Sequence, residues 1–500
     1  MFTFLSSTRF VNPVRWLFPA LTTVLCVGPA WAIAPDDLPD IGSPAEATIS
    51  IDEEYRIGLS VLREYRNADQ ILEDPEVTQY IDTLGHRLSS AAQDGKHRFQ
   101  FVVVKDPAIN AFAVPGGFIF VNSGLLLATQ NESELAGVLA HEISHVTQRH
   151  IIRSLLEQRK STMASTAAIL AAILLGATTG AGSDAALAGI AGAQTLALAQ
   201  QMSFSRDMES EADRVGMGVL SRAGFDPNGM PDFFEVIARQ SGGGEANIPA
   251  IVLSHPVTSD RIAEARARVA ELPPHKATDS VSYAIARERI RVLTTPAGES
   301  ALSYYTAKQK LGTPLNAADD YGKAIALMQG GDPTHAVPLL KNLAEHNETI
   351  AQYWTALGQA QAAAGDKTGS LATFERAMKL FPRDVPTTVR YADALVKFGN
   401  PALAHKVLLD LFNVVEPTPA QVRHLAIIAN AANDVGDAYY YMCEYHVMSG
   451  DLALAVNQLQ LALAVPKLTD VQRARFRARL DEIRLAMPRR VRTQQSEGGP

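Results

Sequence analysis

Residues 131–147 read Asn-Glu-Ser-Glu-Leu-Ala-Gly-Val-Leu-Ala-His-Glu-Ile-Ser-His-Val-Thr, and this stretch decides the fold of the N-terminal part. Apolar residues recur in it at helical spacing, which predicts a helix with one apolar face. These residues are Leu135, Val138, Leu139 and Val146. Asn131 can cap the start of the helix, and Glu134 can complete a capping-box-like arrangement.

The same stretch contains His141-Glu142-Ile143-Ser144-His145. Positions four apart lie on one face of a helix, so the two imidazoles can reach a single ion. Glu142 is offset by about 100°, close enough to take a proton from a metal-bound water. Neutral imidazole suits zinc, and a catalytic zinc has three protein ligands and a water. The pattern predicts one Zn²⁺ per chain, although five such residues also occur by chance in unrelated chains.

The third ligand must come from elsewhere in the chain. Positions 148 and 151 hold Gln and Ile, which excludes a third histidine in the metzincin arrangement. His150 lies five residues beyond His145, on a different face of a helix, and is interpreted as structural or as an outer residue of the site. A carboxylate on a later helix remains.

The acidic helix expected at 205–214 supplies such carboxylates. Glu209 and Asp213 are four residues apart and share a face, whereas Glu211 points away. A ligand role for Glu209, with Asp213 hydrogen-bonded to a ligand histidine, is chemically sensible. A solvated, salt-bridged helix is the alternative, and spacing alone favours it.

Length and charge limit the class of protein. Five hundred residues predict two or three domains. Residues 1–32 have the apolar run and the small–x–small site, Ala30-Trp31-Ala32, of a cleavable secretory signal; an uncleaved anchor is the alternative. Without them the chain has 43 basic and 53 acidic side chains, a formal charge of −10, which argues against nucleic acid as a partner. The remaining cysteine, Cys443, allows no internal disulfide and is interpreted as a core residue.

The motif helix belongs to a domain expected over 33–292. The runs 99–104 and 118–121 predict strands, and the second is a candidate edge for pairing with an extended substrate. Residues 161–205, rich in Ala, Gly, Leu and Ile, predict an apolar helical hairpin that is buried or touches a membrane; a true span is the alternative. The fold class expected is α+β, mostly helical, with a small sheet.

The C-terminal third repeats. Gly331-Asp332, Gly365-Asp366 and Gly399-Asn400 are spaced by 34 residues, the period of tetratricopeptide repeats, and Gly450-Asp451 follows after 51. An all-α solenoid is therefore expected at 317–487, with roughly half a unit inserted, a linker at 293–316 before it and a disordered tail at 488–500 after it. Its concave surface is interpreted as a binding site for a peptide or protein, with a passive scaffold as the alternative.

Four ordered motifs carry a resemblance to a known family. They are Asn110-Ala-Phe-Ala-x-Pro-Gly-Gly117, His141-Glu-x-x-His145, Ser205-Arg-x-x-Glu209-x-Glu-Ala-Asp213 and His255-Pro-x-x-x-x-Arg261. The set resembles the HtpX-type and CaaX-protease-type zinc peptidases, which have a gluzincin-type domain. With the signal segment and the C-terminal repeats, it is similar to the periplasmic β-barrel assembly-enhancing proteases over nearly the whole mature chain.

The resemblance implies roles for particular residues. It implies Glu209 rather than Glu211 as the third ligand, beside His141 and His145, with Glu142 and Asp213 as the catalytic pair. His255 would take the fourth zinc position and hold the enzyme shut; a loop histidine before a proline is the alternative. Arg261 would orient the substrate or an acidic neighbour.

The resemblance also implies a function. It implies a zinc endopeptidase in the periplasm that assists assembly of outer-membrane β-barrel proteins with their assembly machinery and degrades stalled ones. The apolar segment 161–205 adds the expectation of a peripheral contact with a membrane. The alternative is a non-proteolytic assembly chaperone or adaptor that acts through its repeats and keeps a latent zinc site.

Overall fold

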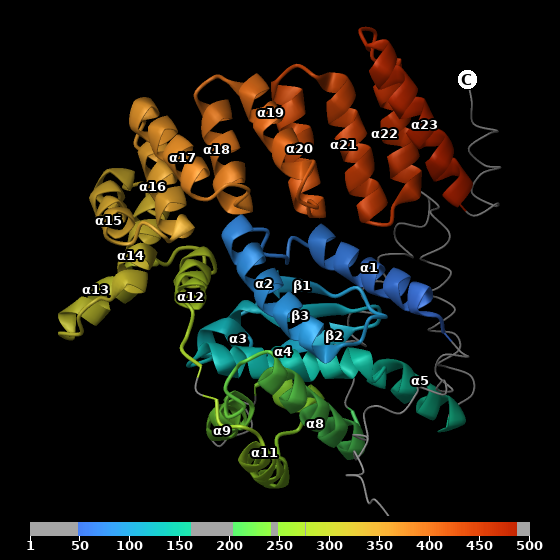
Figure 1. Ribbon diagram of the computed structural model, residues 1–500, viewed down its shortest axis with the longest axis vertical. Coiled ribbons are helices and arrows are strands. Elements are labelled where there is room, and N and C mark those ends of the chain that lie inside the picture. Colours follow the sequence, from blue (N-terminus) through green and yellow to red (C-terminus); the bar gives the residue numbers. More distant parts are fainter. Residues whose placement is uncertain (1–48, 162–203, 242–248, 276, 488–500) are drawn as a thin grey trace, which may run out of the picture. The chain divides into compact units, whose positions relative to one another are not determined.

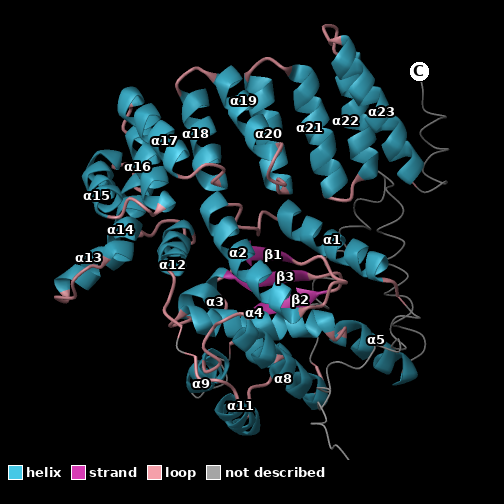
Figure 2. Ribbon diagram, in the orientation of Figure 1, coloured by secondary structure: helices cyan, strands magenta, loops and turns pink. Residues whose placement is uncertain are grey.

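The computed structural model describes residues 49–161, 204–241, 249–275 and 277–487 (Figure 1). Helices dominate them, accompanied by one three-stranded sheet (Figure 2), which confirms the fold class expected from the sequence. The expected signal segment, nearly all of the apolar hairpin and the expected tail lie outside the described residues. Within the described ranges, no helix combines the length and apolar character needed to cross a membrane.

The N-terminal elements are helices packed around one three-stranded sheet. The helices are α1 (Ile51–Asn67), α2 (Pro75–Ala92), α3 (Ser123–Ala128), α4 (Glu132–Thr147), α5 (His150–Ser161), α8 (Arg206–Arg222), α9 (Gly229–Ser241), α10 (Ala250–Ser254), α11 (Ser259–Glu271) and α12 (Val281–Leu293). The strands are β1 (Gln100–Val104), β2 (Ala111–Val114) and β3 (Phe118–Asn122). The sequence predicted α4, the first half of α8 and the strands β1 and β3, whereas α1, α9 and β2 were not predicted.

The order of strands in the sheet is β1-β3-β2, with β1 parallel and β2 antiparallel to β3. The expectation that 118–121 forms an edge is therefore wrong, because β3 is the central strand. All five of its residues are buried, as a strand covered on both faces requires. Gly116 and Gly117 turn the chain between β2 and β3 with φ of 86° and 91°, a region open to glycine. The edge beside the motif helix is instead β2.

Helix α4 runs through the middle of this core. Asn131 caps it as predicted, accepting a hydrogen bond from the Glu134 amide at 2.9 Å, while the Glu134 carboxylate accepts one from the Gln130 amide. The helix is buried on every side from Glu132 to Val146, so its polar face is covered as well as its apolar face. It packs against α8, α9, α2 and β2.

Helix α8 approaches α4 closely. A Cβ on Gly216 would lie 3.0 Å from the backbone oxygen of Ala140, so only a residue without a side chain fits this crossing comfortably. Because Gly216 lies two turns beyond Glu209, the same face of α8 brings Glu209 and Asp213 to the histidine face of α4. The small residue thus decides how near the acidic residues lie to the histidines.

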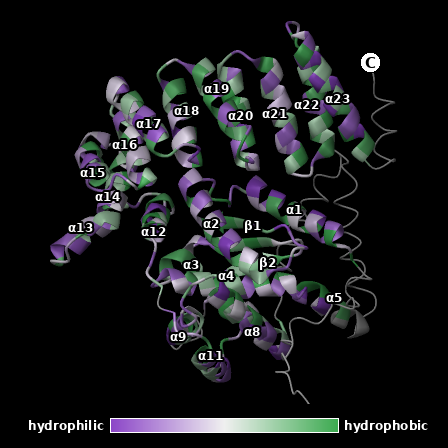
Figure 3. Cartoon of the chain, in the orientation of Figure 1, coloured by the Kyte–Doolittle hydropathy of each residue, from purple (hydrophilic) through white to green (hydrophobic). Residues whose placement is uncertain are grey.

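The C-terminal elements are helices throughout. They are α13 (Leu302–Lys310), α14 (Ala317–Gln329), α15 (Pro333–His346), α16 (Ala351–Ala363), α17 (Lys367–Leu380), α18 (Val385–Lys397), α19 (Pro401–Phe412), α20 (Pro419–Ala431), α21 (Val435–Met448), α22 (Leu452–Ala464) and α23 (Asp470–Ala486). Each helix from α14 to α23 packs against the next in the chain, as stacked repeats do. Hydrophobic and hydrophilic residues alternate in short stretches along them (Figure 3), which fits helices buried on one side.

The helix turns of the repeats explain the irregular spacing. Gly331, Gly365 and Gly399 have φ near 80°, and Asn433 takes the same left-handed region at φ 61°. Asn433 stands 34 residues after Gly399, so the period continues through a residue that is not glycine but tolerates this backbone. Gly450 then ends α21, half a unit later. Cys443 on α21 is fully buried in an apolar cluster, as interpreted from the sequence.

A buried ion network joins the start of α2 to three later helices. Asp74 caps α2 and accepts hydrogen bonds from Arg289 of α12 at 2.7 and 2.8 Å and from Arg390 of α18 at 2.8 Å. Glu76 accepts from Arg390 as well, and Tyr321 of α14 accepts from Arg289 at 3.0 Å. Burial alone would raise the pKa of Asp74, but the charges of Arg289 and Arg390 and the hydrogen bonds to Asp74 together outweigh it and hold that pKa well below its usual range.

Removing the charge of Asp74 is expected to destabilise the protein strongly. Asp74→Asn keeps a residue that can cap a helix, but it leaves a buried guanidinium uncompensated, a loss of about 3 kcal/mol or more. Thermal unfolding should shift clearly downward. The control is Asp366→Asn, an exposed cap of α17, whose change should stay within about 0.5 kcal/mol. Equal melting temperatures of the two variants would contradict a stabilising role for the network.

Candidate metal centre

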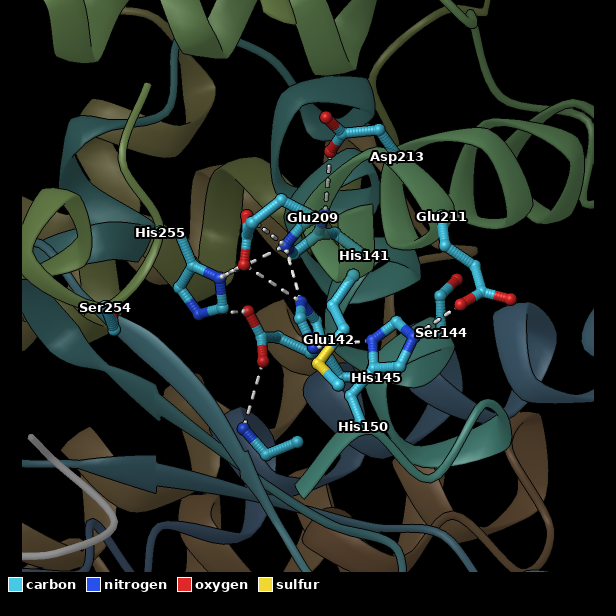
Figure 4. A network of polar contacts seen from close by, with 12 residues as sticks. His141, Glu142, Ser144, His145, His150, Glu209, Glu211, Asp213, Ser254 and His255 are labelled. Atoms are coloured by element: carbon cyan, nitrogen blue, oxygen red, sulfur yellow. Dashed lines mark hydrogen bonds and ion pairs between the residues drawn. The ribbon is translucent and has the colours of Figure 1, made fainter. Parts of the chain in front are cut away.

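Three segments that are distant in the sequence bring four possible ligands together (Figure 4). His141 and His145 lie on α4, and Glu209 lies on α8. His255 is the residue directly after the end of α10. One donor atom from each lies within 4.8 Å of the others, and all four side chains are buried. Among the described residues, this is the sole such group of histidine, cysteine and acidic side chains. The structure thus brings together every residue that the sequence reading placed on the ion.

The spacing of the donor atoms fits a tetrahedral ion. Donors about 2.0–2.1 Å from a zinc lie about 3.3 Å from one another. The His141 and His145 Nε2 atoms are 2.9 Å apart, His141 Nε2 and His255 Nδ1 are 3.3 Å apart, and each α4 histidine is 3.6 Å from a Glu209 oxygen. The residues present therefore fit a zinc ion, and His255 lies near enough to the other three to be a fourth donor.

Charge supports the same conclusion. Glu142, Glu209 and Asp213 are three buried carboxylates, and the Arg261 guanidinium contacts Glu209 and Asp213. With neutral histidines, the ionised groups carry two uncompensated negative charges in a region closed to water. Buried charges are costly unless they are paired or coordinate a metal, and a divalent cation would balance these two.

Asp213 fixes the orientation of His141. Its Oδ1 atom lies 2.9 Å from His141 Nδ1, so a proton on Nδ1 leaves the lone pair of Nε2 directed at the ligand group. Arg261 binds both oxygens of Asp213 at 2.8 Å. Burial would raise the pKa of Asp213, but the hydrogen bonds from His141 and Arg261 lower it to about 2. The carboxylate is therefore charged at every physiological pH.

Arg261 contacts acidic neighbours in the described structure. Besides Asp213, its guanidinium lies 2.7 Å from Glu209 Oε2 and donates to the Pro256 carbonyl at 2.9 Å. It thereby ties α8 to the loop that carries His255. Of the two roles expected for Arg261, orientation of an acidic neighbour matches these contacts.

Glu142 lies beside the ligands but is directed at β2. Its Oε2 atom accepts a hydrogen bond from the Ala113 amide at 3.0 Å, and its Oε1 atom lies 3.5 Å from His255 Nε2. Burial raises the pKa of Glu142, partly offset by His255 and His141. A carboxyl with a raised pKa can both accept and return a proton. The Ala113 contact was not foreseen, because a backbone amide leaves no mark in a sequence.

The acidic helix resolves into two different environments. Glu209 contacts His255 Nδ1 at 2.8 Å, whereas Glu211 points away from the ligand group and contacts His150 at 3.1 Å. His150 is fully buried, and its Nδ1 lies 3.1 Å from Nδ1 of His145. The aromatic ring of Phe204, 4.1 Å from the His145 ring centre, was also missed. The contacts of His150 and Phe204 with His145 follow no periodic pattern in the sequence, so they could not be predicted from it.

Comparison with known proteins agrees with this centre. Residues 75–269 match peptidase family M48. A beta-barrel assembly-enhancing protease of Yersinia pestis is 35% identical, over 90% of this chain and 92% of its own. A putative one of Vibrio cholerae is 32% identical, over 94% and 97%. That of Escherichia coli K12 is 32% identical, over 95% and 96%. The chain therefore belongs to the family of the beta-barrel assembly-enhancing proteases, and its M48 part makes it a metallopeptidase.

Proposed function

We propose that this chain is a periplasmic zinc endopeptidase that assists the assembly of outer-membrane β-barrel proteins and degrades stalled or misfolded ones. The observation that carries the proposal is the convergence of His141, His145 and Glu209 beside the buried base Glu142. The names of the relatives support the link to barrel assembly. The signal-like residues 1–32 support export to the periplasm.

The residues of the centre suffice for peptide hydrolysis. When bound, a zinc ion supplies a Lewis acid for the scissile carbonyl and makes a water more acidic. Glu142 takes the proton of that water and returns it to the leaving amine, for which its raised pKa is suited. Asp213, charged and held by Arg261, keeps the His141 ring in place during these steps.

The edge of β2 is suited to hold the substrate. Its register with β3 directs the Ala113 amide away from the sheet, toward Glu142. An extended peptide paired along this edge would place its backbone next to the base. The Ile251 amide of α10 now donates to the Ile109 carbonyl at 3.1 Å, beside the start of β2. The segment 250–255 must therefore move before a peptide can pair there, and His255 moves with it.

Glu142→Gln tests the peptidase function. The change removes the base but spares the four possible ligands, so hydrolysis of an unfolded outer-membrane barrel protein should fall by at least about 100-fold. Zinc content should stay near one ion per chain by elemental analysis. Glu345→Gln, on the exposed side of α15, is the matched control and should cleave as the parent does. Unchanged cleavage by the Glu142 variant would exclude this carboxylate as the base.

His255→Ala tests whether the centre is held shut. Alanine frees the fourth position while three ligands remain, so cleavage should increase several-fold with no loss of zinc. The control is His346→Ala, an exposed histidine at the end of α15. A slower reaction, or loss of the ion, would instead assign His255 a role that the open enzyme needs.

A second candidate function is an assembly chaperone or adaptor that acts through the repeats. The specific observation in its favour is that His255 lies among His141, His145 and Glu209, where it could take the fourth position on an ion and exclude water. The repeats also border a cavity of about 790 Å³, together with α2 and β1. Ile427 of α20 lines it and is 59% exposed, so its side chain is available for contact with a partner. An apolar segment of a partner protein would cover it.

Ile427→Glu tests this use of the cavity. A charge there should weaken binding of the unfolded barrel protein by about tenfold, because one aliphatic contact is lost. The measurement is titration in the Glu142→Gln background, so that no cleavage occurs. Val471→Glu, an exposed apolar position of α23 that does not line the cavity, is the control. Equal affinities for both variants would place the binding surface elsewhere.

A further inference from the structure

On the Nδ1 side of His145, a series of polar contacts leads away from the possible metal ligands, and its residues have no direct part in peptide hydrolysis. We propose that His150 and Glu211 position His145 for metal binding, through a continuous line of hydrogen bonds from His145 to Arg153. His150 is thus a positioning residue. The inference rests on the proposed ligand role of His145 and deepens it, because it explains how that ring is held.

The contacts follow one another without a gap, and Figure 4 shows those that link His145, His150 and Glu211. Nδ1 of His145 lies 3.1 Å from Nδ1 of His150. Nε2 of His150 lies 3.1 Å from Glu211 Oε2, and the same oxygen accepts from Arg153 Nη1 at 2.8 Å. His145 and His150 are fully buried, whereas the Glu211 side chain is 29% exposed. This line of hydrogen bonds therefore leads from the metal centre toward the protein surface.

The hydrogen bond to Glu211 determines which ring nitrogen carries the proton in His150 and in His145. An ionised carboxylate only accepts, so Glu211 requires the proton of His150 on Nε2. Nδ1 of His150 then carries a lone pair and accepts from His145 Nδ1. The lone pair of His145 remains on Nε2, the atom that faces His141 and Glu209. Glu211 thereby selects the tautomer of His145 that can bind a metal, although it never reaches the ion.

The backbone places His150 where this contact is possible. In a continuous helix, a residue five positions on lies about 140° around the axis and could not face His145. Here α4 ends at Thr147, and Arg149 takes the left-handed conformation at φ 52°. The Arg149 side chain pairs with Glu54 and donates to the Ile49 carbonyl at 2.6 Å, which fixes the turn. His150 therefore folds back onto the ring of His145.

The two α4 histidines are thus held in different ways. Nδ1 of His141 lies 2.9 Å from a carboxylate oxygen of Asp213, whose charge Arg261 balances. His145 donates to a neutral imidazole, and the charge of Glu211 lies one residue further away. Because a neutral acceptor polarises an imidazole less, the loss of His150 should weaken metal binding without abolishing it.

Two substitutions of His150 separate positioning from packing. Asparagine presents an oxygen near the place of Nδ1, so His150→Asn keeps an acceptor for His145 but leaves unfilled space. Phenylalanine fills the space and removes the acceptor. If His150 positions His145, zinc affinity measured by chelator competition should fall about 10- to 100-fold in His150→Phe and only a few-fold in His150→Asn. A packing role predicts the opposite order.

The second arm uses Glu211, which is partly exposed and tolerates change. Glu211→Gln keeps an acceptor and should hold zinc nearly as the parent does, whereas Glu211→Leu should weaken it. Cobalt absorption bands should shift in the Leu and Phe variants alone. His405→Phe, a buried histidine of α19, is the control.

Parent protein without zinc would refute the proposed metal site itself. Parent-like zinc affinity in both His150→Phe and Glu211→Leu, or a weaker His150→Asn than His150→Phe, would overturn the positioning role alone. Far-UV circular dichroism of each metal-free variant confirms that the comparison is made between folded proteins.

Discussion

The close crossing of α4 and α8 is the contact on which the rest of the N-terminal structure depends. Gly216 admits the backbone of Ala140 to within van der Waals distance, and the acidic face of α8 then meets the histidine face of α4. Neither helix would bury so many polar groups alone, because unpaired buried charges are costly. The crossing therefore buries more negative than positive charge, because Arg261, paired with Asp213 and Glu209, is opposed by three carboxylates.

This excess of buried negative charge couples the binding of a cation to folding. Two uncompensated negative charges remain among the buried groups when the histidines are neutral, and an unfolded chain has no preformed place for a cation. The free energy of metal binding consequently adds to the free energy of folding of this region. The centre should be viewed as part of the hydrophobic core and not as an accessory on its surface.

Sequence reasoning reached the local features and missed the tertiary ones. The α4 helix, its Asn131 cap and the pair of histidines follow from spacing, which is a local property. Spacing could not choose between Glu209 and Glu211; the resemblance did so, and the structure places Glu209 among the histidines. The central position of β3 depends on strand pairing, which local sequence does not fix. Asn433 was overlooked because the repeat was recognised by glycine, whereas the backbone requires only a residue that tolerates positive φ.

The left-handed residue at position 149 has a consequence for protein engineering. Arg149 combines a strained positive φ with an ion pair to buried Glu54, and an Arg149→Ala substitution would keep the strain while removing that ion pair. Here that substitution would favour fusion of α4 and α5 into one straight rod and would swing the imidazole of His150 to the opposite side. A less stable protein with an impaired centre would result, because the buried Glu54 would lose its partner; the ion pair at Arg149 thus maintains the geometry of His150.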